Sequence, residues 1–223
     1  MTTRPASPRP RAAASTAALA PAARKQTRES ASTREAQLLD IACRLFGQKG
    51  YDRTSLRDIA EVAGITKAAL YYHFPDKEAL YDRVVIESLQ RLNAFVSERT
   101  ALGTTPIGRI RAYFQATAEH LDNHRYEWMA GSNAFWAETG AHREQALALR
   151  DQFEKILRQC VIDGIESGEI RAVDPSLAGK FLLSSFGVIA RWHSPKGRLS
   201  VQDVMQHFVD YALNGLAAEP GKA

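Results

Sequence analysis

Apolar residues recur every three or four positions along most of this chain, and no segment shows the alternation of apolar and polar residues that marks a β-strand. One such stripe near the start consists of Leu38, Ile41, Ala42, Leu45 and Phe46. This spacing gathers the apolar side chains on one face of an α-helix. The pattern therefore predicts an all-α fold of nine or ten helices without internal repeats.

Capping and turn residues indicate where these helices begin and end. Ser32 and Glu35 form a capping box that predicts the start of the first helix, and Gly50 predicts its end. Similar signals predict short helices that start near Ser55 and at Thr66. Longer helices are expected over about residues 77–98, 106–121, 126–136 (as one or two helices), 141–167, 175–193 and from residue 200 onward.

Basic residues are concentrated at the N-terminus. Residues 1–33 hold six Lys or Arg and one acid, residues 34–80 hold seven of each, and the remainder holds 16 basic and 17 acidic residues. Residues 1–31 offer almost no apolar surface to bury, so we expect a disordered basic tail. A transit peptide or a translation start assigned too far upstream are the alternatives. The tail alone raises the isoelectric point, which is therefore no evidence for nucleic-acid binding by the folded part.

Several other classes of protein lack their sequence signatures here. The longest apolar stretch, residues 177–190, is too short to span a bilayer and contains Lys180, so we expect no membrane partner. Cys43 and Cys160 belong to no Cys-x-x-Cys pair. The sequence therefore supports neither a disulfide framework nor a zinc knuckle, and it fits a reducing cytoplasm.

No motif of an enzyme or a cofactor-binding protein is present either. The chain has no phosphate-binding Walker loop and no dinucleotide fingerprint, and Ser184 and Ser185 lack the glycine frame of a nucleophile elbow. His120 and His124 have a spacing that can hold a metal ion but no third ligand at a fixed offset, so we expect a solvated helix end instead. We therefore expect no catalytic residue, no cofactor and no metal.

Residues 54–74 form the most informative segment, in which two short helices are joined by a turn at Gly64. Ala60 is small where the helices approach each other, and Ile65 and Leu70 can hold the second helix in place. This is helix-turn-helix geometry, whose second helix can enter the major groove of DNA. An ordinary helical hairpin is the alternative. Lys77 favours a phosphate partner, because a cation at the start of a helix is structurally unfavourable.

Residues 34–80 resemble the DNA-binding domain of the TetR family of bacterial transcriptional regulators. The most specific matches are Ala42-x-x-Leu45-Phe46-x-x-x-Gly50-Tyr51, Thr54-Ser55-Leu56-Arg57-Asp58-Ile59-Ala60 and Leu70-Tyr71-Tyr72-His73-Phe74-x-x-Lys77-x-x-Leu80. The resemblance implies a homodimer. Each chain would have a DNA-binding domain over residues 32–80 and a helical effector-binding and dimerisation domain over residues 81–218.

The resemblance also implies roles for individual residues. The second helix of the pair would face bases or nearby backbone with Thr66, Lys67, Ala69 and Tyr71. Phosphates would be held mainly by Thr54, Ser55, Arg57, Tyr72, His73 and Lys77. The basic tail could add phosphate or minor-groove contacts beside the operator.

The C-terminal part is more loosely similar to TetR-type regulators of fatty-acid, steroid or aromatic-acid catabolism, several of which sense acyl-CoA thioesters. The similarity lies in Gly168-Glu169-Ile170-Arg171-x-x-Asp174-Pro175, Arg191-Trp192 and Gly197-x-Leu199-Ser200. A hydrophobic drug or lipid is the alternative effector. Candidate effector-binding residues are Trp128, Phe135, Trp136, Phe181, Phe186 and Arg191. Each aromatic residue could instead be plain core, and Arg191 could pair with an acidic side chain.

The apolar stripes of two C-terminal helices favour a dimer. Residues 141–167 and 175–193 would pair with their copies as a four-helix bundle, with close approach at Cys160 and Gly164. The expected function is that of a ligand-responsive repressor, which a small hydrophobic or acyl-CoA-like effector releases from a palindromic operator in double-stranded DNA. A helical carrier or enzyme that merely retains the hairpin is the alternative.

Overall fold

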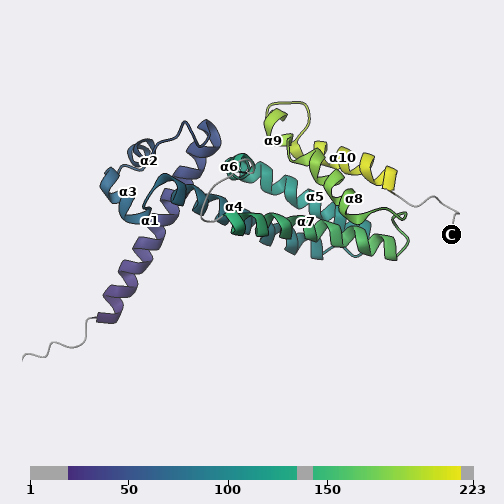
Figure 1. Cartoon of the computed structure of the whole chain (residues 1–223), viewed down its shortest axis with the longest axis horizontal. Helices are drawn as coiled ribbons and strands as arrows, with labels where there is room; N and C mark the ends of the chain where they lie inside the picture. Colours follow the sequence, from purple (N-terminus) through teal and green to yellow (C-terminus); the bar gives the residue numbers. More distant parts are fainter. Residues whose placement is uncertain (1–19, 135–142, 217–223) are drawn as a thin grey trace, which may run out of the picture. The chain divides into compact units, whose positions relative to one another are not determined.

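The computed structural model describes residues 20–134 and 143–216, and these residues form helices without a strand. The predicted all-α fold is thus confirmed, and Figure 1 shows the order of the helices. Residues 37–223 form one compact unit and residues 1–36 another. The helices are α1 (Ala20–Lys49), α2 (Leu56–Val62), α3 (Lys67–His73), α4 (Lys77–Ala101), α5 (Pro106–Asn123), α6 (Arg125–Ala134), α7 (Arg143–Glu166), α8 (Pro175–Phe186), α9 (Ile189–Trp192) and α10 (Val201–Leu216).

Helix α1 begins earlier than the capping residues predict. It starts at Ala20, so Ser32 lies inside the helix and does not cap it. Residues 20–31, part of the expected disordered tail, are helical in α1, and residues 1–19 lie outside the described part of the chain. The segment from Ala20 to Glu35 is rich in Ala, Arg, Lys, Gln and Glu, which are strong helix formers. The helix extends over this segment because its residues have high helix propensity, although they form no apolar stripe.

The first hydrophobic core joins the C-terminal half of α1 to α2, α3 and the start of α4. Ile59 and Leu70 are fully buried in it, and Ala60 lies where α2 and α3 approach. The predicted spacer and core roles of these residues agree with their burial, whereas Ile65 is only partly buried. The remaining buried side chains of this core are Leu38, Leu39, Ala42, Cys43, Leu45, Phe46, Leu56, Phe74, Leu80, Tyr81, Val84, Val85 and Ala130.

The turn between α2 and α3 depends on Gly64. Its φ of 64° lies in the left-handed region, where a residue with a Cβ is strained. The amide of Gly64 donates to the carbonyl oxygen of Glu61, and the amide of Ile65 donates to that of Ala60. This pair of hydrogen bonds is a Schellman motif, which ends α2 and sets the direction in which α3 begins.

The second hydrophobic core lies among α4, α5, α7, α8 and α10. Helix α5 packs against α4, α7 and α10, and α7 packs against α4, α5 and α8. None of the ten described helices combines the length and the apolar character that a membrane span requires.

The apolar stripe of α7 faces this core, which corrects the predicted dimer interface. Cys160, Val161 and Gly164 are buried within their own chain. A Cβ built on Gly164 would lie 2.6 Å from Cδ1 of Ile170. The lack of a side chain at Gly164 therefore permits close packing against Ile170 of the same chain. The sequence pattern identifies a face that must be covered, but it does not say which helix covers it.

Exposed apolar side chains lie instead along α8 and α9. They are Leu177 and Phe181 of α8, Val188 just before α9, and Trp192 of α9. A stripe of this kind on a soluble helical protein is typical of a subunit interface. We therefore expect the second copy of the chain to pack on α8 and α9.

We predict different outcomes for one acidic substitution in each stripe. Phe181 is 57% exposed, so a charge at this position should not disturb the fold of the single chain. Phe181→Glu should therefore give monomers with unchanged helix content, because the charge lies in the expected subunit interface. Val161→Glu should unfold the chain, because it buries an unpaired charge at a fully covered position. Sedimentation equilibrium and circular dichroism measure the two properties. Stable Phe181→Glu dimers would contradict the assigned interface.

Candidate DNA-binding site

Helix α2 begins with the predicted capping box. The hydroxyl and the amide of Ser55 both donate to Oδ2 of Asp58, over 2.8 and 2.9 Å, and Oγ of Ser55 accepts from the amide of Asp58. These hydrogen bonds, with that from the Ser55 amide the largest cause, lower the pKa of Asp58. Ser55 is exposed, but its hydroxyl is engaged in the cap. The hydroxyl of Ser55 is therefore not free to bind a phosphate, and a phosphate would instead contact the exposed start of α2.

Thr54 lies inside the domain, which contradicts its predicted side-chain contact with a phosphate. It is only 1% exposed, and its hydroxyl donates to the carbonyl oxygen of Gly50 over 2.8 Å. The residue thus ties the loop before α2 to the end of α1. Ser55, the next residue of the family motif, is exposed, because the side chains of successive residues point in different directions where the chain enters the helix.

Helix α3 presents one buried side and one open side. The hydroxyl of Thr66 caps the helix by accepting from the amide of Ala69 over 3.1 Å. Leu70 points into the core, whereas Lys67, Ala69 and Tyr71 are exposed as predicted for a groove-facing surface. Small side chains at this surface allow a helix to approach base edges closely.

Polar and aromatic groups surround this open side. Nζ of Lys67 lies 5.4 Å from the centre of the Tyr71 ring, one helical turn away. Tyr72 is 88% exposed, and its ring meets that of the half-buried His73 edge to face. Hydroxyl, amine and imidazole groups are all able to contact phosphates or bases. The predicted DNA contacts among residues 67–73 therefore all lie on one continuous helix, α3.

Lys77 is held in place by an aromatic residue that the sequence analysis did not single out. Its Nζ lies 4.0 Å from the centre of the Tyr51 ring, a distance at which a cation–π interaction stabilises the charge. The rings of Tyr51 and Tyr81 in turn lie 4.7 Å apart. Tyr51 follows Gly50 in the family-like motif, and this position is the only signal that could have indicated its role.

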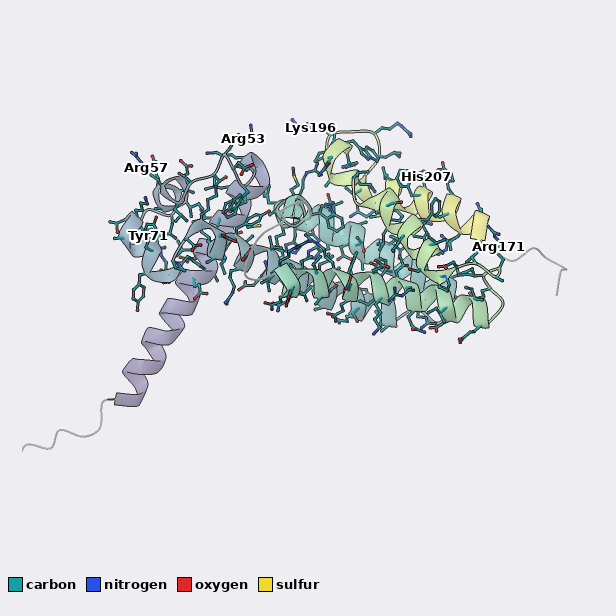
Figure 2. All side chains as sticks on the ribbon, in the orientation of Figure 1. Arg53, Arg57, Tyr71, Arg171, Lys196 and His207 are labelled. Atoms are coloured by element: carbon teal, nitrogen blue, oxygen red, sulfur yellow. The ribbon has the colours of Figure 1, made fainter. Side chains whose placement is uncertain are left out.

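Two arginines add charge around α2 and α3 (Figure 2). Arg57, a predicted phosphate contact, is exposed on α2. Arg53 was not predicted; it is exposed in the loop before α2, and its Nε donates to the carbonyl oxygen of Lys49 over 2.9 Å. The described surface of this domain therefore carries exposed cations from the loop, from α2 and from Lys67 of α3.

The structure does not gather the candidate effector residues into one site. Phe186 is buried, with its ring 4.0 Å from that of Phe114. Phe181 and Arg191 are exposed. Phe135 and Trp136 lie outside the described residues. Phe181 belongs instead to the apolar stripe of α8 and α9.

Buried polar atoms in the C-terminal helices are the signal that the sequence analysis missed. Trp128 is half-buried, and its Nε1 has no hydrogen-bond partner among the described residues. The same holds for Oδ1 of Asn93, whose Nδ2 donates to the carbonyl oxygen of Leu149. It holds also for Nδ1 of His193, whose Nε2 lies 2.9 Å from the carbonyl oxygen of Leu199. Unpaired polar atoms at buried positions are unfavourable unless water or a ligand meets them.

His120 is buried and remains neutral near pH 7. Burial, and then the neighbouring His124, lower the pKa of His120 to about 4. The rings of the two histidines lie 4.7 Å apart, and that of Phe95 lies 6.0 Å from His120. His120 is therefore part of the core and not of the solvated helix end that its sequence position predicts. No group of three metal-ligating side chains occurs among the residues that were placed.

Helix α6 contacts the DNA-binding domain through its backbone. The hydroxyl of Tyr81 donates to the carbonyl oxygen of Ala130 over 2.9 Å. A Cβ built on Gly47 of α1 would lie 2.8 Å from the carbonyl oxygen of Tyr126, so only a glycine permits this approach. A displacement of α6 would therefore act directly on α1 and α4.

The other side of α6 is bonded to α9 and α4. Arg125 donates from Nη2 to the carbonyl oxygens of Ala190 and His193 over 2.8 and 3.0 Å. Glu127 forms an ion pair with Arg91, over 3.2 Å between Oε1 and Nη2. Helix α6 is thus bonded to both the end of α9 and the helices that carry α2 and α3.

Two family models match this chain. Residues 38–84 match the model described as "Bacterial regulatory proteins, tetR family". Residues 103–216 match the model described as "Tetracyclin repressor-like, C-terminal domain". These matches confirm both the resemblance of residues 34–80 and the looser similarity of the C-terminal part to TetR-type regulators.

Individual relatives match over nearly their whole length. The HTH-type transcriptional repressor KstR2 of Rhodococcus jostii (strain RHA1) is 30% identical over 197 residues, which cover 84% of this chain and 93% of the relative. The structure of PfmR from Thermus thermophilus has 31% identity and a TM-score of 0.74, and covers 79% of this chain and 97% of its own. AibR, solved with isovaleryl coenzyme A and operator DNA, has 25% identity and a TM-score of 0.73, with 82% and 98% covered.

Lys67→Ala and Tyr71→Ala should each weaken binding to a DNA duplex that the protein selects from random sequence. The expected loss is about 1–3 kcal/mol for each contact that reaches a base, with relaxed preference at the contacted position. Both residues are exposed, so the free energy of unfolding should hardly change. Lys196→Ala, an exposed cation between α9 and α10, is the matched control. Full affinity in a folded double variant would refute the assignment of α3 as the recognition helix.

Proposed function

Because this chain belongs to the TetR family of bacterial transcriptional regulators, we propose that it is a repressor that a small effector releases from a palindromic operator. The observation that carries this proposal is the open side of α3, where Lys67, Ala69 and Tyr71 are exposed while Leu70 anchors the helix in the core. A second copy of the chain would supply the second half-site. Half-sites read by such pairs lie about one helical turn apart, roughly 34–36 Å, or a modest excess over it.

Phosphate contacts would position this helix on the duplex. Ser55, Arg57, Tyr72, His73 and Lys77 remain the candidates, with Arg53 added and Thr54 removed. Lys77 carries a charge that the Tyr51 ring already orients, so little side-chain entropy is lost when it meets a phosphate. Base contacts would fall to Thr66, Lys67, Ala69 and Tyr71, with Thr66 limited by its role as the helix cap.

The proposed effector is an acyl-CoA thioester with an apolar acyl group. One relative supports the thioester, because AibR was solved with isovaleryl coenzyme A. Another, KstR2 of Mycobacterium tuberculosis, is described as a ketosteroid regulator, which supports an apolar group. Within residues 20–134 and 143–216, the indole N–H of Trp128 has no acceptor and suits a carbonyl oxygen. Oδ1 of Asn93 has no donor within the same residues and suits an amide or hydroxyl group.

Helix α6 provides the route by which the effector would lower DNA affinity. Trp128 lies on α6 between Tyr126, which contacts Gly47, and Ala130, which accepts from Tyr81. A ligand that favours one position of α6 would therefore favour one position of α1 and α4. Coupling between two such sites is typically about 1–3 kcal/mol.

The effector proposal is tested by release of the protein from its selected duplex. We expect isovaleryl-CoA or a bulkier cyclic acyl-CoA to weaken binding at least about fivefold, the lower end of ordinary allosteric coupling. Coenzyme A alone and the free carboxylic acids are the controls, and they should have little effect. Release by free acids or neutral hydrophobic compounds but not by any thioester would contradict the acyl-CoA class while leaving the repressor function intact.

Tyr81→Phe should weaken this coupling. The substitution keeps the ring and removes only the hydrogen bond to α6, which costs about 1 kcal/mol of stability. DNA affinity without effector should stay within about twofold, while the effector concentration needed for half release rises, because the link to α1 and α4 is looser. Fluorescence anisotropy measures both quantities.

Tyr113→Phe is the matched control for this test. Its hydroxyl also donates to a backbone carbonyl, that of Phe153 over 3.1 Å, but both partners lie within the effector domain. The loss of stability should be similar and the release curve unchanged. Equal effects of the two variants on release would show that α6 is not the specific link.

A further inference from the structure

His193, which directly follows α9, is a buried polar residue that the proposed function does not use. Its amide donates to the carbonyl oxygen of Ile189 over 2.8 Å, and its carbonyl oxygen accepts from Nη2 of Arg125 over 3.0 Å. Its Nε2 lies 2.9 Å from the carbonyl oxygen of Leu199. Nδ1 of the same ring has no hydrogen-bond partner in the part of the chain that the structure describes.

The partner of Nε2 determines what Nδ1 can bind. The carbonyl oxygen of Leu199 can only accept a hydrogen bond, so the ring proton lies on Nε2. A neutral imidazole carries one such proton, which leaves Nδ1 as an acceptor. The group that completes this residue is therefore a donor, an N–H or an O–H.

Solvent does not reach this acceptor in the structure. His193 is 7% exposed, and Nδ1 itself is buried. A buried acceptor without a donor is unfavourable, because it has given up water and gained no partner. A donor can reach Nδ1 only if the groups around it move, so a ligand that supplies the donor favours the moved arrangement over the one described here.

The surroundings of His193 change along the chain in the same order as the chemistry of an acyl-CoA thioester changes along the ligand. Before His193, Ile189 and Ala190 are buried in the second hydrophobic core. After it, the loop between α9 and α10 carries the exposed cations Lys196 and Arg198, and Lys196 is labelled on this loop in Figure 2. Residues 191–202 contain no acid. An acyl-CoA thioester likewise consists of an apolar acyl group, then an arm with neutral amides, then phosphates.

We propose that Nδ1 of His193 accepts a hydrogen bond from the amide N–H closest to the sulfur of a bound acyl-CoA thioester. This inference rests on the proposed function, which assigns that class of effector, and it adds a residue that recognises the arm of the ligand. The thioester group has no donor, so this amide carries the first N–H that follows the apolar acyl group. A free carboxylate only accepts hydrogen bonds and cannot take its place.

Arg125 connects the proposed contact to α6. Its Nη2 donates to the carbonyl oxygens of Ala190 and His193 over 2.8 and 3.0 Å. Carbonyl oxygens at the end of a helix lack partners within that helix, so this side chain joins the end of α9 to the start of α6. A movement of His193 on ligand binding would therefore act on α6, the helix that contacts α1 and α4.

Two substitutions separate the roles of the two ring nitrogens. His193→Gln keeps a donor that can reach the carbonyl oxygen of Leu199, but it has no acceptor at the position of Nδ1. His193→Asn keeps an acceptor near that position and loses the contact with Leu199. His207→Gln, at an exposed histidine of α10, is the matched control. Circular dichroism and thermal unfolding measure the fold of each variant.

Binding is measured without DNA, by calorimetry or by competition, for three thioesters of one acid. The acid is isovaleric or cyclohexanecarboxylic acid, whichever CoA thioester binds the full chain more tightly. The second ligand is its N-acetylcysteamine thioester, which keeps the amide closest to the sulfur. The third is its S-propyl thioester, which has no N–H group.

The full chain should bind the N-acetylcysteamine thioester about fivefold more tightly than the S-propyl thioester, the effect of one neutral hydrogen bond. His193→Gln should lose this preference and bind the CoA thioester about fivefold more weakly. His193→Asn and His207→Gln should keep both properties within about twofold. The nitrogen NMR signal of Nδ1 in the full chain needs no substitution: it should shift with the N-acetylcysteamine thioester and not with the S-propyl thioester.

Three results would overturn the inference. The first is an equal preference in the full chain and in folded His193→Gln. The second is a loss in His193→Gln that affects only the CoA thioester, which would place the donor farther along the arm. The third is an unchanged Nδ1 signal when the N-acetylcysteamine thioester binds. Failure of the full chain to bind either CoA thioester would instead overturn the proposed effector class, and this inference with it.

Discussion

The position of α3 depends on one contact, the burial of Leu70 against the core formed by α1, α2 and the start of α4. The Schellman turn at Gly64 brings α3 to that contact, and the hydroxyl of Thr66 caps it. Leu70 is the one buried residue of α3, so the residues around it, Lys67 and Tyr71 among them, are left exposed. The surface that we assign to the major groove is thus a consequence of hydrophobic packing and needs no interaction among its own exposed residues.

The same core also explains how a distant ligand can change DNA affinity. Tyr81 is one of its buried residues, and its hydroxyl donates to the carbonyl oxygen of Ala130 on α6. Gly47 lets the backbone of α6 touch α1 without an intervening side chain. Packed interfaces of this kind shift between discrete arrangements and do not deform gradually. Under the proposed mechanism, a small displacement of α6 would change the separation of the two recognition helices in a dimer.

Much of the DNA-binding domain was predictable because short-range rules determine it. The caps at Ser55 and Thr66 and the burial of Leu70 follow from local patterns, and the structure agrees with each. Thr54 was misplaced because a motif gives sequence position and not the direction of a side chain. The stripe of α7 was assigned to a partner chain because periodicity shows which face is apolar, while the helix that covers it depends on long-range packing. The unpaired atoms of Asn93 and Trp128 could not be foreseen, since partners of buried groups come from several helices.

Hydroxyl-radical footprinting on the selected duplex, with and without a releasing acyl-CoA, tests the central claim most directly. The account predicts two protected segments whose centres lie about one helical turn apart, roughly 34–36 Å, or a modest excess over it. Both segments should lose protection together when the acyl-CoA binds, because the two recognition helices move as parts of one dimer. A single protected segment, or protection that persists in the presence of a bound effector, would contradict the account.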